Sequence, residues 1–301
     1  MIYSQEVLLI YLKKKMLILM FLTSHIFTYM SLLKRLIYPT AAVRPSYWEK
    51  CFHGKWIVIT GASHGIGKEL AYRLIDAKAN LFLIARTVTE LEQISADAHK
   101  KNCACLFKAM DLRNRADLDS LCEELNETLP AVDYFFANAG KSIHSPISNA
   151  LDRMHDYDRT MELNYRSLVA ISLALLPTLS QRRGTIIYTS SVSSIFPPAP
   201  GWSAYHASKE AANVWCKTAN VEFYRKGVSV KIAYMPLVHT QMSDVNETYR
   251  KMEAYSAQEA ADILIRLSLN SKSYYKPWWT RLAEPFLPFL TPVIRFFYKY
   301  I

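Results

Sequence analysis

Glycine and cysteine are both scarce in this chain of 301 residues, which contains eight glycines and five cysteines. An odd number of cysteines argues against a disulfide scaffold. Cys103 and Cys105 lie close together, but they lack the second pair or the nearby histidines that a zinc site requires. We therefore expect reduced cysteines and no bound metal. The chain also lacks internal repeats and low-complexity stretches, which excludes the solenoid and disordered classes.

A basic excess is absent from the middle of the chain. The net charge is +10, but residues 1–50 carry +5 and residues 271–301 carry +4, which leaves +1 for the part between them. That central part also lacks a motif of interleaved aromatic and basic residues. We therefore expect no nucleic-acid partner. Basic residues at the two ends are instead typical of segments close to a membrane.

The central part alternates between apolar, β-branched runs and segments with helical spacing. This alternation predicts an α/β fold, a doubly wound parallel sheet of the Rossmann type with helices on both faces. The length allows one such domain with tails, without room for a second full domain. The expected strands are 56–60, 80–85, 104–109, 132–137, 185–190 and 228–234, and the expected helices are 66–76, 87–100, 115–127, a long one near 150–180, and 203–226.

Three of the eight glycines, Gly61, Gly65 and Gly67, lie within seven residues directly after the first expected strand. A strand that leads through a glycine-lined turn into a helix forms a phosphate cradle, because the backbone is bare and free N–H groups face the anion. The spacing is G-x-x-x-G-x-G, so the G-x-G-x-x-G fingerprint is not matched literally. The turn predicts a dinucleotide site.

Arg86 follows the second expected strand, where NAD-selective sites place a carboxylate for the ribose hydroxyls. An arginine there suits a 2′-phosphate instead. Arg86 therefore favours NADPH over NADH, the alternative being a solvated loop residue.

Tyr205 and Lys209 stand four residues apart in SAYHASK. A four-residue step places two side chains on one face of a helix. An ammonium beside a phenol lowers the phenol pKa toward the working range, so that Tyr205 can exchange a proton with a carbonyl or alcohol oxygen.

Together these motifs resemble the short-chain dehydrogenase/reductase family in its classical form, over roughly residues 54–240. The resemblance is carried by TGASHGIG at 60–67, MDL at 110–112, ANAG at 137–140, Asn164 in MELNYRS, SS at 190–191, YHASK at 205–209 and MPLVHT at 235–240.

The resemblance implies four catalytic residues. Tyr205 would be the acid/base, and Lys209 would lower its pKa while holding a nicotinamide ribose hydroxyl. Ser191 would hydrogen-bond the substrate carbonyl oxygen, and Asn164 would hold a water that connects Lys209 to solvent. The implied cofactor-binding residues are Gly61, Ser63, His64, Gly65, Ile66, Gly67, Arg86, Asp111, Leu112, Asn138, Ala139, Gly140, Pro236, Val238 and Thr240, together with Tyr205 and Lys209.

The chain departs from the family pattern in three places. Ser191 lies fourteen residues before Tyr205 instead of thirteen, so Ser190 and Ser193 are alternatives to it. Ala137 and Leu237 stand where the family usually has asparagine and glycine. Reductases that act on fatty acyl groups have a stretch similar to Met235–Met242, followed by a helix start similar to residues 256–261.

The two ends have a different character from the centre. Met16–Leu33 is eighteen residues without a formal charge, close to the about 20 that a spanning helix needs. We interpret it as a membrane anchor, spanning or monotopic; the alternatives are a dimerisation or substrate-pocket helix, or a true start at Met16 or Met30. Residues 271–301 hold ten aromatics interspersed with cations, which suits a bilayer interface or an apolar flap over the substrate cleft. Four prolines there argue against one long regular helix.

These observations give one main expectation. Residues 1–50 form a membrane-anchor helix and linker, 51–245 an NAD(P)-binding catalytic domain, and 246–301 a substrate cap or membrane-interface segment. The protein reduces a ketone or aldehyde on a lipid-like substrate with NADPH, such as a 3-ketosphinganine, a long-chain 3-oxoacyl or fatty acyl derivative, or a steroid. The alternatives are NAD-dependent oxidation of a membrane-borne alcohol or steroid, and a redox sensor without turnover. We expect a homodimer by resemblance, attached to a membrane with the catalytic domain facing the cytoplasm.

Overall fold

The computed structural model describes residues 36–298 apart from 41–44, 130, 198 and 245–246. The chain forms two units, Met1–Ala41 and Ala42–Ile301. In the first unit residues 36–40 are described, and Leu36 and Ile37 are helical. The predicted anchor over Met16–Leu33 lies outside the described residues. Among the helices that the structure does describe, none is long and apolar enough to cross a membrane.

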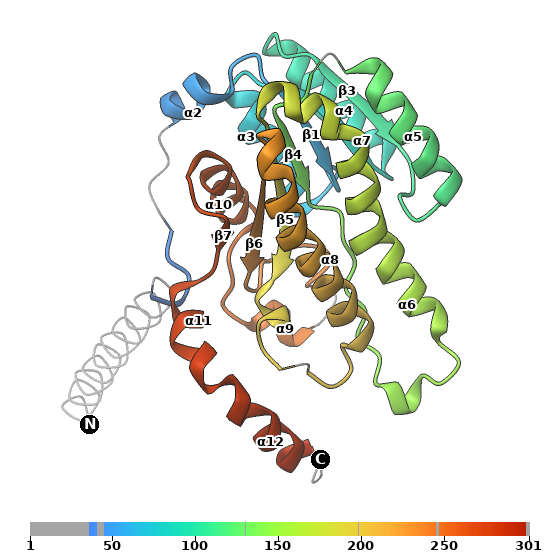
Figure 1. Cartoon of the computed structure of the whole chain (residues 1–301), viewed down its shortest axis with the longest axis vertical. Coiled ribbons are helices and arrows are strands. Elements are labelled where there is room, and N and C mark those ends of the chain that lie inside the picture. Colours follow the sequence, from blue (N-terminus) through green and yellow to red (C-terminus); the bar gives the residue numbers. More distant parts are fainter. Residues whose placement is uncertain (1–35, 41–44, 130, 198, 245–246, 299–301) are drawn as a thin grey trace, which may run out of the picture. The chain divides into compact units, whose positions relative to one another are not determined.

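The second unit is built on a parallel sheet of seven strands. Figure 1 shows strands of this sheet in the middle of the unit, among the helices. The strand order is β3-β2-β1-β4-β5-β6-β7. This is the doubly wound arrangement that the alternating sequence predicts, with one short strand added at the edge. The strands are β1 (Trp56–Thr60), β2 (Asn80–Ala85), β3 (Cys105–Ala109), β4 (Tyr134–Ala137), β5 (Thr185–Ser191), β6 (Ser229–Met235) and β7 (Tyr274–Tyr275).

Helices cover both faces of this sheet (Figure 1). One face carries α5 (Arg115–Thr128), α7 (Ser167–Arg182) and α8 (Ser203–Glu222), whose apolar side chains share one core with alternate residues of the strands. The other face carries α3 (Gly65–Asp76), α4 (Val88–Lys100) and α10 (Ala257–Leu269). The remaining helices are α2 (Pro45–Phe52), α6 (Met154–Met161), α9 (Glu247–Lys251), α11 (Trp278–Ala283) and α12 (Leu287–Tyr298).

The central strands β1, β2 and β4 are mostly apolar because both faces of the sheet are covered there. In β1, Ile57, Val58 and Ile59 are all fully buried. Successive strand residues point to opposite faces, so Val58 joins the core under α5 and α7 while its two neighbours face the other layer. This double coverage fixes the carboxyl ends of β1, β4 and β5 side by side, where the predicted site residues lie.

The long helix predicted near 150–180 is interrupted in the structure. It consists of α6, a π-helical turn η2 (Glu162–Arg166) and α7, and a 3-10 turn, η1 (Ile147–Asn149), precedes it. The π turn carries Asn164, whose side chain forms three hydrogen bonds with neighbouring segments. Single π turns are frequent at functional sites. The helix predicted over 203–226 ends similarly, since its last residues form a 3-10 turn, η4 (Phe223–Lys226), before Gly227.

The C-terminal part begins as a layer of the sheet domain. A capping box of Ser256 and Glu259 starts α10, which packs against α3, and β7 then pairs with β6. Beyond β7 the chain forms α11, the 3-10 turn η5 (Glu284–Phe286) and α12. The described residues of this stretch therefore form several short helical segments and not one long regular helix, as the prolines there predict. The division into an anchor, a catalytic domain and a cap remains a prediction.

Lys231 on β6 fastens the end of α10 to the sheet. Its buried ammonium donates hydrogen bonds to the carbonyl oxygens of Leu267, Ser268 and Asn270, at 3.1, 3.0 and 2.5 Å. These carbonyls lie at a helix C-terminus, where no intrahelical donor remains and where a cation is favoured.

Replacing Lys231 with Met should therefore destabilise the fold. The variant leaves buried carbonyls without a donor, which costs about 1–3 kcal/mol. At about 2–4 °C per kcal/mol for a domain of this size, thermal unfolding of the detergent-solubilised protein should show a lower Tm. Lys217→Met, at an exposed position of α8, is the matched control and should leave Tm in place. Equal Tm values for both variants would contradict the capping role.

Candidate active site

The glycine turn between β1 and α3 adopts conformations that other residues rarely take. Gly61 and Gly65 have φ values of +69° and +54°. A Cβ on Gly67 would lie 2.1 Å from the carbonyl oxygen of Gly61, so this position has no room for a side chain. The first turn of α3 holds no acidic residue. Bare backbone at the N-terminus of this helix fits the phosphates of a dinucleotide.

The segment after β4 lies against this turn. The Thr60 hydroxyl accepts hydrogen bonds from the backbone N–H groups of Asn138 and Ala139, both at 3.1 Å. A Cβ on Gly61 would lie 3.0 Å from the Cα of Ala139. The structure thus brings together two groups of predicted cofactor residues that are far apart in sequence.

The predicted residues after β6 reach the same turn. A Cβ on Gly65 would lie 3.0 Å from Cγ2 of Thr240. Val238 forms a bridge with Tyr255 that fixes this segment, and Pro236 is buried directly after β6. Within the glycine turn His64 Nδ1 lies 2.9 Å from the Ser63 hydroxyl, and Ile66 belongs to the first turn of α3.

Arg86 is exposed directly after β2, at the edge of the predicted adenosine site. Asp111, after β3, forms a bidentate ion pair with Arg113, and Leu112 between them is buried. The Arg113 hydrogen bond lowers the pKa of Asp111, and the charge of Arg86 lowers it further. Two arginines therefore act on one carboxylate here. The sequence analysis missed Arg113, although its position two residues after Asp111 is the signal that points to it.

Asn164 is almost completely buried in the π turn and joins three segments. Its Oδ1 accepts from the backbone N–H of Lys141 at 2.8 Å, and its Nδ2 donates to the Lys141 carbonyl oxygen and the Ser208 hydroxyl, both at 2.9 Å. Gly140 lies beside it, because a Cβ there would stand 3.3 Å from Asn164 Oδ1 and 3.4 Å from Lys209 Nζ. Asn164 and Lys209 thus both border the space that the missing side chain of Gly140 leaves open.

Lys209 is buried on α8 one helical turn after Tyr205. Its ammonium donates to the carbonyl oxygen of Thr189 at 2.8 Å, and lies 4.9 Å from the Tyr188 ring centroid and 5.9 Å from that of Tyr205. Among the residues that the structure describes, it forms no ion pair with a carboxylate. Burial therefore lowers the pKa of Lys209 to about 8, against a smaller opposing effect of Cys216.

Tyr205 differs from the sequence prediction in the direction of its pKa. A pKa lowered by Lys209 was expected, but burial raises the pKa of Tyr205, with a hydrogen bond from Ser191 opposing the rise. The physical reason is that the same apolar surroundings penalise a phenolate and an ammonium alike. Tyr205 is therefore protonated near neutral pH in this structure, which is the form that donates a proton.

Ser191 is the serine that acts on Tyr205, since its hydrogen bond opposes the rise in the pKa of Tyr205 that burial causes. It ends β5, and its hydroxyl lies 2.8 Å from that of Ser193. Ser190 points to the other face of the sheet, where its buried hydroxyl donates to Asn213 at 2.7 Å. The alternation of side chains along a strand thus separates Ser191 from Ser190.

An aromatic cluster beside Tyr205 went unnoticed in the sequence. The Trp202 ring lies 6.1 Å from that of Tyr205, 4.9 Å from His144, and stacks on Tyr249 of α9 at 6.0 Å. Three segments far apart in sequence therefore meet around the proton donor. A Trp three residues before the Tyr was the available signal, but spacing alone does not distinguish it from a core residue.

Comparison with known proteins agrees with this geometry. The family model described as short chain dehydrogenase matches residues 55–251. A fatty acyl-CoA reductase of Acinetobacter baylyi is 36% identical over 213 residues, which cover 70% of this chain and 72% of that protein. A very-long-chain 3-oxoacyl-CoA reductase of Aspergillus terreus is 28% identical over 197 residues, 65% of this chain and 56% of that protein.

A solved structure shares the fold. An alcohol dehydrogenase from the archaeon Thermococcus sibiricus, complexed with 5-hydroxy-NADP, superposes with a TM-score of 0.65 at 21% identity, covering 74% of this chain and 95% of that chain. The predicted family and its resemblance to fatty acyl reductases are both confirmed. With its glycine turn, Asn164, Tyr205 and Lys209 in place, the chain belongs to the short-chain dehydrogenase/reductase family and is an NAD(P)-dependent oxidoreductase.

Proposed function

We propose that this protein is an NADPH-dependent reductase that acts on the carbonyl group of a fatty acyl or 3-oxoacyl lipid. The observation that carries the proposal is the placement of Tyr205 on α8 one helical turn before the buried Lys209, whose ammonium lies 5.9 Å from the Tyr205 ring centroid. A reduction needs a proton donor at the carbonyl oxygen, and a protonated phenol supplies one. The fatty acyl-CoA and 3-oxoacyl-CoA reductases among the relatives support the lipid substrate.

Different residues of the chain would bind the phosphates and the nicotinamide ribose of the cofactor. The glycine turn would hold the phosphates at the N-terminus of α3, and Lys209 would hold a ribose hydroxyl near Gly140. The bound nicotinamide supplies the hydride. Ser191 orients the carbonyl oxygen by hydrogen bonding, and Tyr205 donates the proton to that oxygen.

Proton supply to Tyr205 would pass through Lys209 and the groups around Gly140. Lys209 lies near both Tyr205 and Gly140, and Asn164 borders the same space over that glycine. Asn164 is fixed by both polar groups of the Lys141 backbone. Its role is to orient this path, because it does not touch the reacting atoms.

Arg86 supports NADPH as the cofactor. It is exposed at the end of β2, and Asp111, whose pKa its charge lowers, is already paired with Arg113. A guanidinium that faces solvent in this position can bind a 2′-phosphate, whereas a ribose without the phosphate gains little from it.

Two other proposals concern partners and location. Exposed apolar side chains on α7 and α8, Leu173, Val214 and Val221, support pairing of two copies through these helices. The five cysteines are thiols that form no disulfide with one another, which supports a reducing compartment, with the catalytic domain facing the cytoplasm. The alternative of NAD-dependent alcohol oxidation is less well supported, because Arg86 stands where an NAD-selective site has a carboxylate.

Tyr205→Phe tests the function. Nicotinamide oxidation by the detergent-solubilised protein should be measured with NADPH and a panel of long-chain acyl thioesters, 3-oxoacyl thioesters and aldehydes. Loss of the proton donor should lower kcat about 10²–10⁴-fold, while NADPH still binds with similar affinity. Tyr224→Phe, at an exposed position, is the control. Unchanged turnover in Tyr205→Phe would overturn the assignment, and NADPH binding without turnover on any panel member would favour a sensor.

Arg86→Ala tests the cofactor preference. Loss of a charge-assisted hydrogen bond to the phosphate, about 1.5–3 kcal/mol, should raise KM for NADPH roughly 10–150-fold, and KM for NADH should hardly change. Arg225→Ala, an exposed arginine of η4, should alter neither constant. If Arg86→Ala changes KM for NADPH and KM for NADH by the same factor, Arg86 does not bind the 2′-phosphate.

A further inference from the structure

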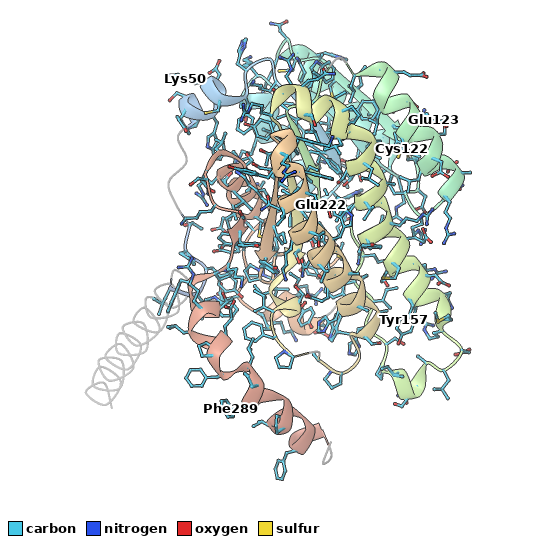
Figure 2. All side chains as sticks on the ribbon, viewed as in Figure 1. Lys50, Cys122, Glu123, Tyr157, Glu222 and Phe289 are labelled. Atoms are coloured by element: carbon cyan, nitrogen blue, oxygen red, sulfur yellow. The ribbon has the colours of Figure 1, made fainter. Side chains whose placement is uncertain are left out.

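Four large apolar side chains form an exposed stripe along α11, η5 and α12. Leu282, Phe286, Phe289 and Val293 have exposed fractions of 63, 63, 70 and 48%. Their spacing of four, three and four residues places them on one side of a helical path. Figure 2 shows Phe289 projecting from α12 away from the sheet. We call these four residues the apolar stripe.

The opposite side of α11 faces the catalytic domain. Thr280 is completely buried, and its hydroxyl donates to the Pro277 carbonyl oxygen at 2.7 Å. The Trp279 ring stacks on Phe196 with centroids 5.9 Å apart. Phe196 belongs to the loop that follows Ser191, so α11 is in direct contact with the loop beside the proposed carbonyl site.

The charge around the apolar stripe is positive. Glu284 is the only acidic residue of 271–301, and it forms an ion pair with Lys276 at 2.6 Å. Lys272 and Arg281 are exposed near the start of the stripe. Apolar and aromatic side chains beside cations are the combination that binds the interface of a bilayer with anionic headgroups.

We propose that the apolar stripe rests on the surface of a lipid bilayer with Leu282, Phe286, Phe289 and Val293 among the headgroups and upper acyl chains. The twelve residues of α12 extend about 18 Å, less than the about 30 Å of a hydrocarbon core, so the helix lies along the interface. Through Trp279 and Phe196 this contact places the loop after Ser191 at the membrane, and an acyl chain enters from the bilayer. The entry route rests on the proposed function, whereas the membrane contact does not.

A second copy of the chain fits the apolar stripe less well. A coiled-coil seam requires the same spacing over at least about three heptads of regular helix. Here the stripe covers less than two heptads and includes the 3-10 turn at Glu284–Phe286, with Pro288 and Pro292 in the helix that follows. These interruptions are compatible with a lipid surface, which imposes no register.

Phe289→Trp in the full chain tests the membrane contact. The variant is reconstituted in phosphatidylcholine/phosphatidylserine vesicles with or without brominated acyl chains, which quench tryptophan at short range. The fluorescence of the new Trp is obtained by subtracting the fluorescence of the parent protein from that of the variant. This difference should be at least about twofold lower in brominated vesicles than in vesicles without bromine. Tyr224→Trp, which is 80% exposed on η4, is the control and should lose little. Equal, weak quenching of both added tryptophans overturns the proposal, including the case in which a second copy covers the stripe.

A double variant, Phe286→Glu and Phe289→Glu, tests the entry route. Both positions are exposed, so Tm should stay unchanged. NADPH-dependent turnover of a long-chain aldehyde embedded in the vesicles should fall at least about tenfold, and turnover of a short soluble aldehyde should remain. If turnover of the long-chain and the short aldehyde falls by the same factor, the proposal that the acyl chain enters from the bilayer is overturned. If the parent protein turns over neither aldehyde, the proposed function fails on these substrates, while the quenching result stands by itself.

Discussion

The burial of one ammonium group constrains the whole site. Lys209 lies inside the domain, where its Nζ donates to the Thr189 carbonyl oxygen at 2.8 Å. Desolvating a charge is costly unless it is paired, and a main-chain carbonyl compensates less than a carboxylate does. The pKa of Lys209 therefore falls to about 8, and the ammonium is left ready to gain a partner. A cofactor hydroxyl close to Gly140 would be such a partner.

Several segments that are distant in sequence contribute to the surroundings of Lys209. Gly140 leaves space between Lys209 and Asn164, and the π turn brings Asn164 to the end of β4. The surroundings that disfavour the ammonium also raise the pKa of Tyr205, so Tyr205 keeps its proton near neutral pH. Burial thus acts on both partners of the Tyr–Lys pair, and it links the packing of α8 to the pKa values of both groups. The aromatic cluster around Trp202 packs beside the proton donor.

The sequence predicts the sheet well because its central strands β1, β2 and β4 are buried on both faces and read as mostly apolar runs. It also predicts the relation of Tyr205 to Lys209 and of Gly61 to Gly67, since both depend on local spacing. The π turn at Asn164 was not predicted, because its cause is a set of hydrogen bonds to Lys141 and Ser208, which are distant in sequence. The pKa of Tyr205 was predicted in the wrong direction, because pairwise spacing reveals a neighbouring charge but not the depth of burial.

The most direct measurement is the affinity for NADPH as a function of pH, in the unaltered protein and in Lys209→Met. Burial raises the pKa of Tyr188, Tyr205 and Cys216, so Lys209 is the group of this cluster that loses its charge near pH 8. Above that pH the Kd of the unaltered protein should rise about tenfold per pH unit, because the neutral amine binds the cofactor weakly. Lys209→Met should bind more weakly at pH 7 and show no such rise. A Kd that is independent of pH in the unaltered protein, or the same rise in both proteins, would contradict the role of the buried ammonium.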